Sequence, residues 1–396
     1  MIRSSIAALA LASAAPLFAE TQRIAPGEGA QERLQEALIL AEPGDEIVLE
    51  AGRYALTDGL SLDVDGVTVR GAGMDASVLD FTNQAGAGEG LLVTSDNVTL
   101  RDFGIENAKG DGIKSKGADQ IIYHALRVEW TNGPDANNGA YGIYPVEASN
   151  VLVQDSYVRG ASDAGIYVGQ SENIIVRRNR VVENVAGIEI ENSNFAEVTE
   201  NLATRNTGGI LVFDLPGLPK VGGGSVLVAR NAVIDNNTDN FAPEGNIVAG
   251  VPAGTGVMIM ANERVQVRDN ALVNNATSHV MLVAYTQDYD DDRYQPRPVE
   301  VALSGNIYGS GGSAPDFPGG EMLTAAVGGA LPPVLTDGLH QGLNVFDEVP
   351  VMTLGLTEVG QSIAEAAPSM WEKPDEFSFN DLEPVSLPAA MEARLK

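Results

Sequence analysis

The sequence predicts an all-β fold, a right-handed parallel β-helix, and three observations predict it. The middle of the chain repeats about every 22 residues, as the stretches that begin at Asn150, Asn173 and Phe195 show. Within each repeat apolar and polar residues alternate, which is the periodicity of strands and not of helices. The repeats also share two registers, one marked by asparagine and one by glycine. A fixed period of this length indicates a solenoid, whose coils bury their apolar side chains against one another.

The first register is an alternating strand that ends in a polar residue, as in "IIVRRN", "AEVTEN", "VLVARN" and "VQVRDN". Leucine-rich repeats have a similar period, but this chain lacks their LxxLxLxxN frame. Because equivalent residues of successive coils stack, we expect the asparagines at these strand ends to form a ladder of side-chain amides. They are Asn179, Asn201, Asn231, Asn270 and Asn306.

The second register is a glycine followed by an alternating strand, as in "GIYVG", "GIEIE" and "GILVF". We expect these glycines to adopt a positive φ at a turn before the strand. They are Gly142, Gly165, Gly187, Gly209 and Gly256. If the residue after each glycine points into the coil, the next one points outward.

The ends of the chain differ from the repeat. Residues 1–19 predict a secretory signal, with Arg3 before an apolar run and cleavage after Ala19, so we expect a periplasmic or secreted protein with no membrane span. Residues 20–45 predict an N-terminal cap with a helix from about Ala30 to Ala41. Residues 46–310 predict the β-helix, and residues 311–396, which are rich in proline and glycine, predict a C-terminal capping and wrapping extension.

Composition narrows the class of ligand. The formal net charge of −30 disfavours nucleic acid and anionic lipid as partners. It also disfavours a bare polyanion such as pectate or alginate unless cations bridge the two, so neutral sugars, or calcium as a bridging cofactor, are the expectations. Cysteine is absent from the sequence, which excludes disulfides and thiolate chemistry.

The stretch "GDEIVLEAGRYAL" resembles the first coil of pectate-lyase-like right-handed β-helices. The stretches "GASDAGIYVGQS", "NVAGIEIENS" and "NTGGILVFDLP", within residues 128–262, resemble a family of exported bacterial parallel β-helix repeat proteins. The resemblance implies the fold and leaves the chemistry open, because the function of that family is not established. Its members tend to be encoded beside a second exported protein, which implies another exported protein as a partner.

One outer wall of the solenoid changes character along its length. The column of outward residues after the glycines begins polar and becomes apolar: Lys114, Tyr144, Tyr167, Glu189, Leu211, Met258 and Met281. The polar half predicts a groove along the Gly-Ile strands that binds or processes a polysaccharide. Tyrosine faces pack against sugar rings and carboxylates accept hydrogen bonds from hydroxyls. We expect Tyr144 and Tyr167 to bind substrate under an insertion that supplies Trp130, Asn132, Asp135 and Asn138.

Four residues are candidates for catalysis. Glu189 and Glu191 lie two residues apart on one strand, about 7 Å by strand rise, which suits an inverting glycosidase pair. Asp163 lies one coil earlier and is expected to join them. Lys114 is a candidate base, because lyases of the fold that the chain resembles deprotonate a uronate with lysine or arginine, usually with calcium. The sequence leaves open whether the protein is an enzyme and, if so, whether it is a polysaccharide lyase or a glycoside hydrolase.

Two other functions stay open. A non-enzymatic scaffold that docks another exported protein would present a broad apolar patch. We expect instead that insertions 215–224 and 236–254, or a partner, cover the apolar half of the wall, which also includes Phe213 and Met260. A minor alternative is a copper-handling protein, with His279 and Met281 facing outward together as soft ligands.

Overall fold

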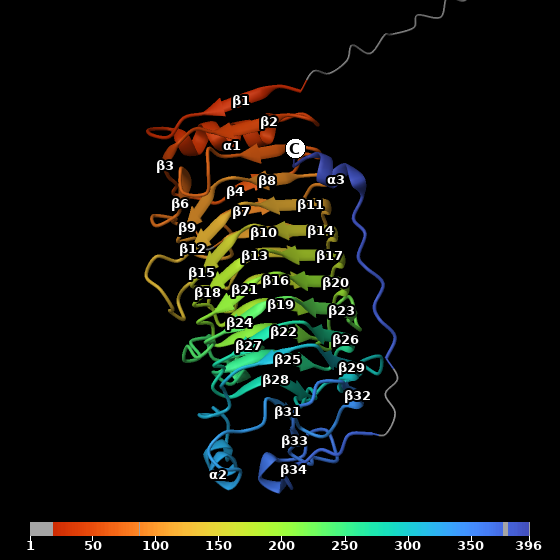
Figure 1. The fold of residues 1–396 in the computed structure, drawn as a ribbon. Coiled ribbons are helices and arrows are strands. Elements are labelled where there is room, and N and C mark those ends of the chain that lie inside the picture. Colours follow the sequence, from red (N-terminus) through yellow and green to blue (C-terminus); the bar gives the residue numbers. More distant parts are fainter. Residues whose placement is uncertain (1–18, 87, 375–378, 396) are drawn as a thin grey trace, which may run out of the picture.

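The computed structural model describes residues 19–86, 88–374 and 379–395. In these residues short strands wind around one axis and stack into three sheets, which we name sheets A, B and C (Figure 1). The predicted signal segment, apart from its last residue, lies outside the described residues. No helix among the described residues has the length and apolar character needed to cross a membrane.

Each sheet takes one strand from nearly every coil, and neighbouring strands are parallel apart from β33 with β34. The strands of sheet A, in order across the sheet, are β1 (Thr21–Ile24), β2 (Glu46–Leu49), β5 (Thr68–Arg70), β8 (Thr99–Arg101), β11 (Asp119–His124), β14 (Ser149–Gln154), β17 (Glu172–Arg177), β20 (Asn194–Thr199), β23 (Gly224–Ala229), β26 (Glu263–Arg268), β29 (Val299–Ser304) and β32 (Gln341–Val345). Those of sheet B are β3 (Gly52–Ala55), β6 (Ser77–Asp80), β9 (Gly104–Glu106), β12 (Arg127–Glu129), β15 (Tyr157–Arg159), β18 (Arg180–Val182), β21 (Leu202–Thr204), β24 (Ala232–Ile234), β27 (Ala271–Val273) and β30 (Ile307–Tyr308). Those of sheet C are β4 (Leu60–Leu62), β7 (Leu91–Val93), β10 (Ile113–Lys116), β13 (Tyr141–Val146), β16 (Ala164–Gly169), β19 (Ala186–Glu191), β22 (Gly208–Phe213), β25 (Thr255–Met260), β28 (Ser278–Val283), β31 (Val334–Thr336), β33 (Val351–Thr353) and β34 (Ser369–Met370).

The core consists of apolar columns inside the coils. The register of sheet C places Ile166 against Ile188, and Ile188 against Ile210. All three side chains are fully buried. The isoleucine after each glycine therefore points inward, as predicted, and the side chain that follows it lies on the outer face of sheet C.

The asparagine ladder is confirmed. Asn179 donates from Nδ2 to Oδ1 of Asn201 over 3.0 Å, and the same bond repeats from Asn201 to Asn231. It continues through Asn270 to Asn306. Each amide also donates to a backbone carbonyl of the preceding coil, as Asn201 does to Val176. The ladder therefore supplies partners to the buried polar groups at the turn between sheets A and B.

A second ladder, which the sequence analysis missed, lies at the turn that follows sheet B. Its bonds run from Asn184 to Asn206, Asn236 and Asn275, with Nδ2–Oδ1 distances of 2.9–3.1 Å. All four side chains are fully buried. Both turns between sheet B and its neighbours are therefore held by stacked amides.

The expectation of positive φ at the glycines before sheet C is wrong. Positive-φ glycines occur elsewhere, at positions such as Gly160 and Gly254. A Cβ at Gly187 would lie 2.5 Å from the carbonyl oxygen of Gly209, and one at Gly209 would lie 2.6 Å from that of Gly256. These positions need glycine because the backbones of adjacent coils approach too closely for a side chain.

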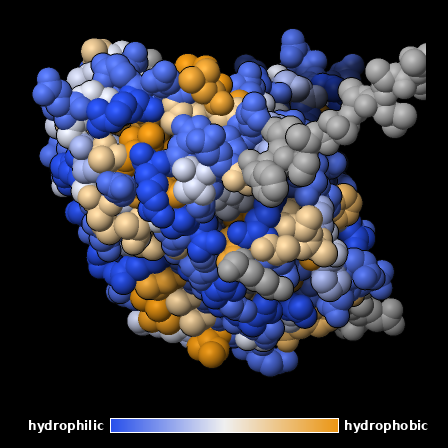
Figure 2. Space-filling view, turned by 90° about the horizontal axis from the view of Figure 1, so that it is seen from above, coloured by the Kyte–Doolittle hydropathy of each residue, from blue (hydrophilic) through white to orange (hydrophobic). Residues whose placement is uncertain are grey.

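The cap and the extension frame the solenoid. Helix α1 (Ala30–Leu40) confirms the predicted N-terminal helix and buries Leu34 and Leu38 against the first coil. Figure 2 looks onto this end and shows mostly hydrophilic side chains with small separate hydrophobic patches. The other helices are short: η1 (Ile247–Gly250), α2 (Gly320–Ala326), η2 (Ile363–Glu365) and α3 (Ala389–Ala393).

The sheets continue outside the range 46–310 predicted for the β-helix, because β1 begins sheet A and β31 to β33 extend sheets A and C. The last segment then runs back along the molecule beside sheet A (Figure 1). There Gln266 donates to Asp381 over 3.0 Å, and Met391 is fully buried against Ile122 and Leu152.

Candidate active site

Three carboxyl side chains are buried together on the outer face of sheet C. Asp163 directly precedes β16, and Glu189 and Glu191 are the outward residues of β19, one coil later. Their exposed fractions are 6%, 1% and 5%. The strand register places Glu189 beside Tyr167 and Glu191 beside Gly169. The structure therefore brings together the three acidic residues predicted for catalysis.

Burial changes the proton affinity of this cluster. Burial, followed by the nearby charge of Glu191, raises the pKa of Asp163 to about 7. Burial also raises the pKa of Glu191 to about 7, against the opposing effect of its hydrogen bond from Tyr167. The pKa of Glu189 is raised well above its ordinary value, first by burial and then by the charges of Asp163 and Glu191. At neutral pH the cluster therefore contains protonated carboxyl groups.

Glu189 has no hydrogen-bond partner within the described protein, at either carboxyl oxygen. Leaving a buried polar group unpaired costs about 1–3 kcal/mol. Buried polar groups in native proteins are nearly always paired, so an unpaired one calls for an explanation such as a catalytic role, a ligand or an ordered water. Glu189 is therefore the side chain of this cluster that is available to a ligand.

Three tyrosines pack over the carboxyl groups. The ring centroids of Tyr141, Tyr144 and Tyr167 lie 4.5–4.9 Å apart. The Tyr167 hydroxyl donates to Oε1 of Glu191 over 2.5 Å, and the Tyr141 hydroxyl lies 3.4 Å from Oδ2 of Asp163. Tyr141 was not predicted, because it stands before its glycine rather than in the outward column.

Gly169 makes room for this arrangement. A Cβ at Gly169 would lie 2.3 Å from Cε1 of the Tyr167 ring. The ring therefore lies flat over the glycine, and this places its hydroxyl against Glu191, the register partner of Gly169. Gly169 is a positioning residue for Tyr167.

Lys114 lies at the edge of the cluster. Its ammonium nitrogen is 3.3 Å from Glu89, 3.6 Å from Asp111 and 4.8 Å from the ring centroid of Tyr144. Burial raises the pKa of Asp111 to about 6. Tyr144 is only half-buried, so this edge is where solvent reaches the tyrosines. Lys114 is paired with two carboxylates and is not positioned as a free base.

The cover over the site differs from the expected overhang. The carboxyl groups lie under residues 236–254, and Asn246 of this segment donates from Nδ2 to Oδ2 of Asp163 over 3.2 Å. Asn240 shapes the segment by donating to the carbonyls of Val248 and Val251. We name residues 236–254 the lid. The predicted open groove is wrong, because the site is closed in this structure.

The residues predicted for the overhang lie elsewhere. Trp130 is buried in the core, and its indole N–H donates to the Ala108 carbonyl over 2.7 Å. The Asn138 amide donates to the backbone carbonyls of Gly133 and Gly160. Asp135 accepts hydrogen bonds from Asn137, and Asn132 is exposed. Among the described residues, no hydrogen bond joins any of these four side chains to the carboxyl cluster.

The apolar half of the wall is covered within the chain, as predicted. Leu211, Phe213, Met258 and Met260 are at most 7% exposed. The predicted insertions contribute to the cover, which also includes later parts of the chain: Leu215, Val221, Ile247, Val248, Val251, Tyr285, Tyr294 and Phe317. The described residues therefore expose no broad apolar patch on this wall.

The copper alternative is contradicted. His279 is 2% exposed, and its ring nitrogens lie 3.2 Å from the Asn275 amide and 3.1 Å from the Gly309 carbonyl. It therefore does not face outward with Met281, which belongs to the covered apolar cluster. Among the described residues no group of three or more histidine or acidic side chains is arranged to hold a metal.

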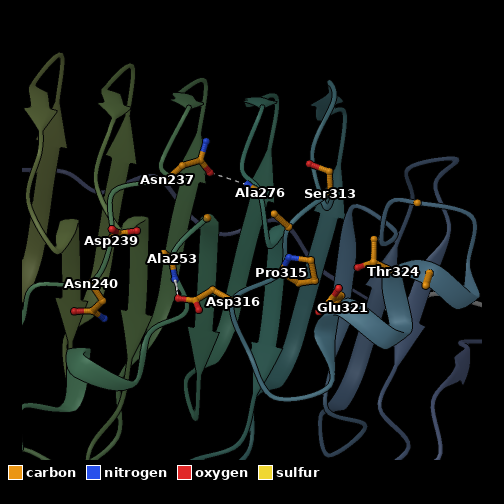
Figure 3. A pocket seen from close by; sticks show the side chains of 14 residues that line it. Asn237, Asp239, Asn240, Ala253, Ala276, Ser313, Pro315, Asp316, Glu321 and Thr324 are labelled. Atoms are coloured by element: carbon orange, nitrogen blue, oxygen red, sulfur yellow. Dashed lines mark hydrogen bonds between the residues drawn. The ribbon is translucent and has the colours of Figure 1, made fainter.

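A pocket of about 990 Å³ lies away from the carboxyl cluster, between the lid and α2. Figure 3 shows Asp239, Asp316 and Glu321 along its wall. Asp316 accepts a hydrogen bond from the Ala253 amide and Asn237 accepts one from Ala276. The wall is thus acidic, and two of its polar side chains serve to fix neighbouring loops.

Comparisons with known proteins agree with this fold. The right handed beta helix region family matches residues 65–221. The A-module of the Azotobacter vinelandii mannuronan C-5 epimerase AlgE4 shares 16% identity, with 82% of this chain and 95% of that chain covered and a TM-score of 0.51. The AlgE6 A-module of the same organism shares 15% identity, with coverages of 80% and 88% and a TM-score of 0.49.

A DFA-IIIase from Arthrobacter chlorophenolicus shares 12% identity, with 74% of this chain and 90% of that chain covered and a TM-score of 0.48. A search of curated protein sequences finds no match to this chain. At 16% identity, the AlgE4 A-module supports the fold and not the chemistry. The chain folds as a right-handed parallel β-helix, and its residues 65–221 match the right handed beta helix region.

Proposed function

We propose that this protein hydrolyses glycosidic bonds of a neutral polysaccharide at Asp163, Glu189 and Glu191. The observation that carries the proposal is the burial of Glu189 beside two other carboxyl groups, with no hydrogen-bond partner for either of its oxygens. Neighbouring carboxyl groups whose surroundings separate their proton affinities are the usual acid and base of glycoside hydrolysis.

The surroundings assign the two roles. The pKa of Glu189 is raised well above its ordinary value, which is the direction that a general acid needs, so we assign to Glu189 the donation of a proton to the glycosidic oxygen as the carbon–oxygen bond breaks. Glu191 accepts a hydrogen bond from Tyr167, which favours its ionised form. It takes a proton from the water whose oxygen attacks the anomeric carbon. The separation of about 7 Å along the strand leaves room for that water.

The charges favour a neutral substrate. The cluster and its edge carry the carboxyl groups of Asp111, Asp163, Glu189 and Glu191, and Lys114 is the cation beside them. A uronate would meet repulsion from the ionised members of this set, and Lys114 is already paired with Glu89 and Asp111. The half-buried ring of Tyr144 offers an apolar face to a sugar ring. That the structural neighbours include a mannuronan epimerase is in line with a carbohydrate substrate.

Access requires the lid to move, since the carboxyl groups are buried beneath it. The Asn246–Asp163 hydrogen bond is one polar contact that opening would break. Closure of such a segment over bound substrate excludes water from the site, as in many enzymes with mobile loops. Export to the periplasm or beyond, where polysaccharides occur, is part of this proposal and follows from the predicted signal segment.

A docking scaffold is less well supported. Its distinguishing feature was a broad apolar patch, and the apolar residues of this wall are covered by the chain itself. Another exported protein would have to bind at a surface other than this wall of sheet C.

The experiment is a panel of neutral and uronic polysaccharides incubated with the protein, followed by measurement of new reducing ends and product analysis. We expect hydrolysis of a neutral glycan and a loss of about 100- to 10,000-fold in rate for Glu189→Gln. Glu200→Gln is the matched control, because Glu200 is an exposed partner of Arg230. Absence of hydrolysis of every neutral glycan, or a Glu189→Gln variant as active as wild type, would overturn the proposal.

A further inference from the structure

A second pocket lies on the same wall as the carboxyl cluster. It encloses about 490 Å³, within the range of small-molecule sites. Its floor is formed by Phe213, Met258, Met260 and Met281, from three successive strands of sheet C. The lid and the chain near Phe317 form its walls. Phenylalanine and methionine side chains offer an apolar surface, and methionine adapts its shape to irregular ligands.

The lining excludes an anionic ligand. No lysine or arginine is among the described residues that line this pocket. The acidic side chain there, Asp337, accepts hydrogen bonds from the Ala284 and Leu339 amides, over 2.6 Å and 2.7 Å. Because these bonds satisfy the carboxyl group, it does not call for a cation. The pocket therefore fits a neutral apolar group.

The pocket lies next to the carboxyl cluster along sheet C. Phe213 is the register partner of Glu191, and Met260 is the register partner of Phe213. Neighbouring strands lie about 4.8 Å apart, so the pocket floor begins one coil beyond Glu191. The lid borders both places, since Asn246 contacts Asp163 and Val251 lines the pocket. The two places therefore lie one coil apart under the same lid.

We propose that this pocket binds an alkyl or acyl chain carried by the glycan, so that the substrate is a neutral glycan with an apolar substituent. The attachment of this alkyl or acyl chain to a glycan rests on the proposed function. The binding of an alkyl or acyl chain in the pocket does not rest on the proposed function.

The test uses butyl, hexyl and octyl β-glucosides below their micelle concentrations, with displacement of the neutral dye N-phenyl-1-naphthylamine as the readout. We expect affinity to rise about fourfold for each added methylene, equivalent to about 0.8 kcal/mol. Glucose alone should not displace the dye. Affinity that is independent of chain length, or octanoate binding as tightly as octanol, would overturn the proposal.

Two variants block the pocket at its edge. Val283→Trp and Thr286→Trp place a large ring where a half-buried and an exposed residue line it. Each should weaken octyl glucoside binding at least tenfold, whereas Ile307→Trp, at an exposed site on sheet B, should leave it unchanged. Thermal unfolding shows which variants are folded. A folded blocking variant with wild-type affinity would contradict the assignment.

The two proposals fail separately. Glu189→Gln should keep the chain-length dependence of binding while losing hydrolysis. Hydrolysis of unsubstituted glycans without any binding of alkyl glucosides would overturn the apolar pocket alone. Chain-length-dependent binding without hydrolysis of any glycan would overturn the proposed function alone.

Discussion

The hydroxyl of Tyr167 donates a 2.5 Å hydrogen bond to Oε1 of Glu191, which lies on the next coil. The bond forms because Gly169 leaves space for the tyrosine ring between the two residues. A hydrogen bond to a carboxylate favours the ionised form, so it opposes the effect of burial on Glu191. Glu189, on the same strand, receives no such bond. This bond, together with the charges of Asp163 and Glu191 that act on Glu189, separates the two glutamates.

Replacing Tyr167 by phenylalanine should raise the pKa of Glu191 above its value of about 7, because the bond that stabilises the carboxylate is lost. The measurement is a carboxyl-carbon NMR titration of protein with labelled glutamate. Tyr157→Phe is the control, since Tyr157 lies on sheet B. An unchanged or lower pKa of Glu191 in Tyr167→Phe would show that the hydrogen bond has no such role.

The carboxyl cluster should make the protein less stable as pH rises. A carboxyl whose pKa is raised in the folded state binds more protons there than in the unfolded chain, so its stabilising effect is complete below about pH 4 and is lost by about pH 7. The double variant Asp163→Asn/Glu191→Gln should therefore show a smaller fall in free energy of unfolding across this window. Denaturant unfolding at a series of pH values measures the difference. Identical pH dependence in the two proteins would contradict it.

The asparagine ladder should contribute measurably to stability. Asn201→Ala removes bonds to Asn231 and to the Val176 carbonyl and leaves the Asn179 amide without its acceptor. We expect a loss of about 1–3 kcal/mol in free energy of unfolding. Asn137→Ala, in an exposed turn, should have little effect. Equal stabilities of the two variants would show that the ladder does not hold the coils.

The stacked glycines should not tolerate even one added methyl group. A Cβ at Gly187 would meet the Gly209 carbonyl at 2.5 Å and the Asn206 amide at 2.9 Å. Backbone of the next coil cannot move away without breaking its own strand pairing, so we expect Gly187→Ala to cost about 1–3 kcal/mol. Gly88→Ala is the control, because a Cβ there meets nothing within 4 Å. Thermal unfolding compares the two, and a Gly187→Ala protein as stable as Gly88→Ala would refute the close approach.

The fold could be predicted from the sequence because the stacked coils of a solenoid need similar residues at equivalent positions, which gives a repeating sequence pattern. Asn179 and Asn201 occupy equivalent positions of successive coils, and their spacing implies that they stack. The second ladder, at Asn184 and Asn206, carries the same 22-residue spacing. The signal that predicts this second ladder is a second column of asparagines, five residues after the first.

The site could be predicted only in part. Side chains alternate along a strand, so the sequence correctly predicts that Glu189 and Glu191 both lie on the outer face of sheet C. Their cover could not be predicted, because the lid is an irregular segment of another coil that reaches Asp163 across 83 residues of sequence. The burial of Trp130 could not be predicted either, because an insertion has no periodicity from which burial can be inferred.

The proposed hydrolysis depends on one chemical state, a protonated Glu189 in the closed site near neutral pH. Infrared difference spectroscopy between wild type and Glu189→Gln at about pH 7 measures it directly, with Glu200→Gln as the control at an exposed glutamate. Because Asp163 and Glu191 also have a pKa of about 7, we expect Glu189→Gln to remove part of the protonated carboxyl absorption and Glu200→Gln to leave it unchanged. A spectrum in which the substitution of Glu189 removes only ionised carboxylate bands would contradict its role as the acid.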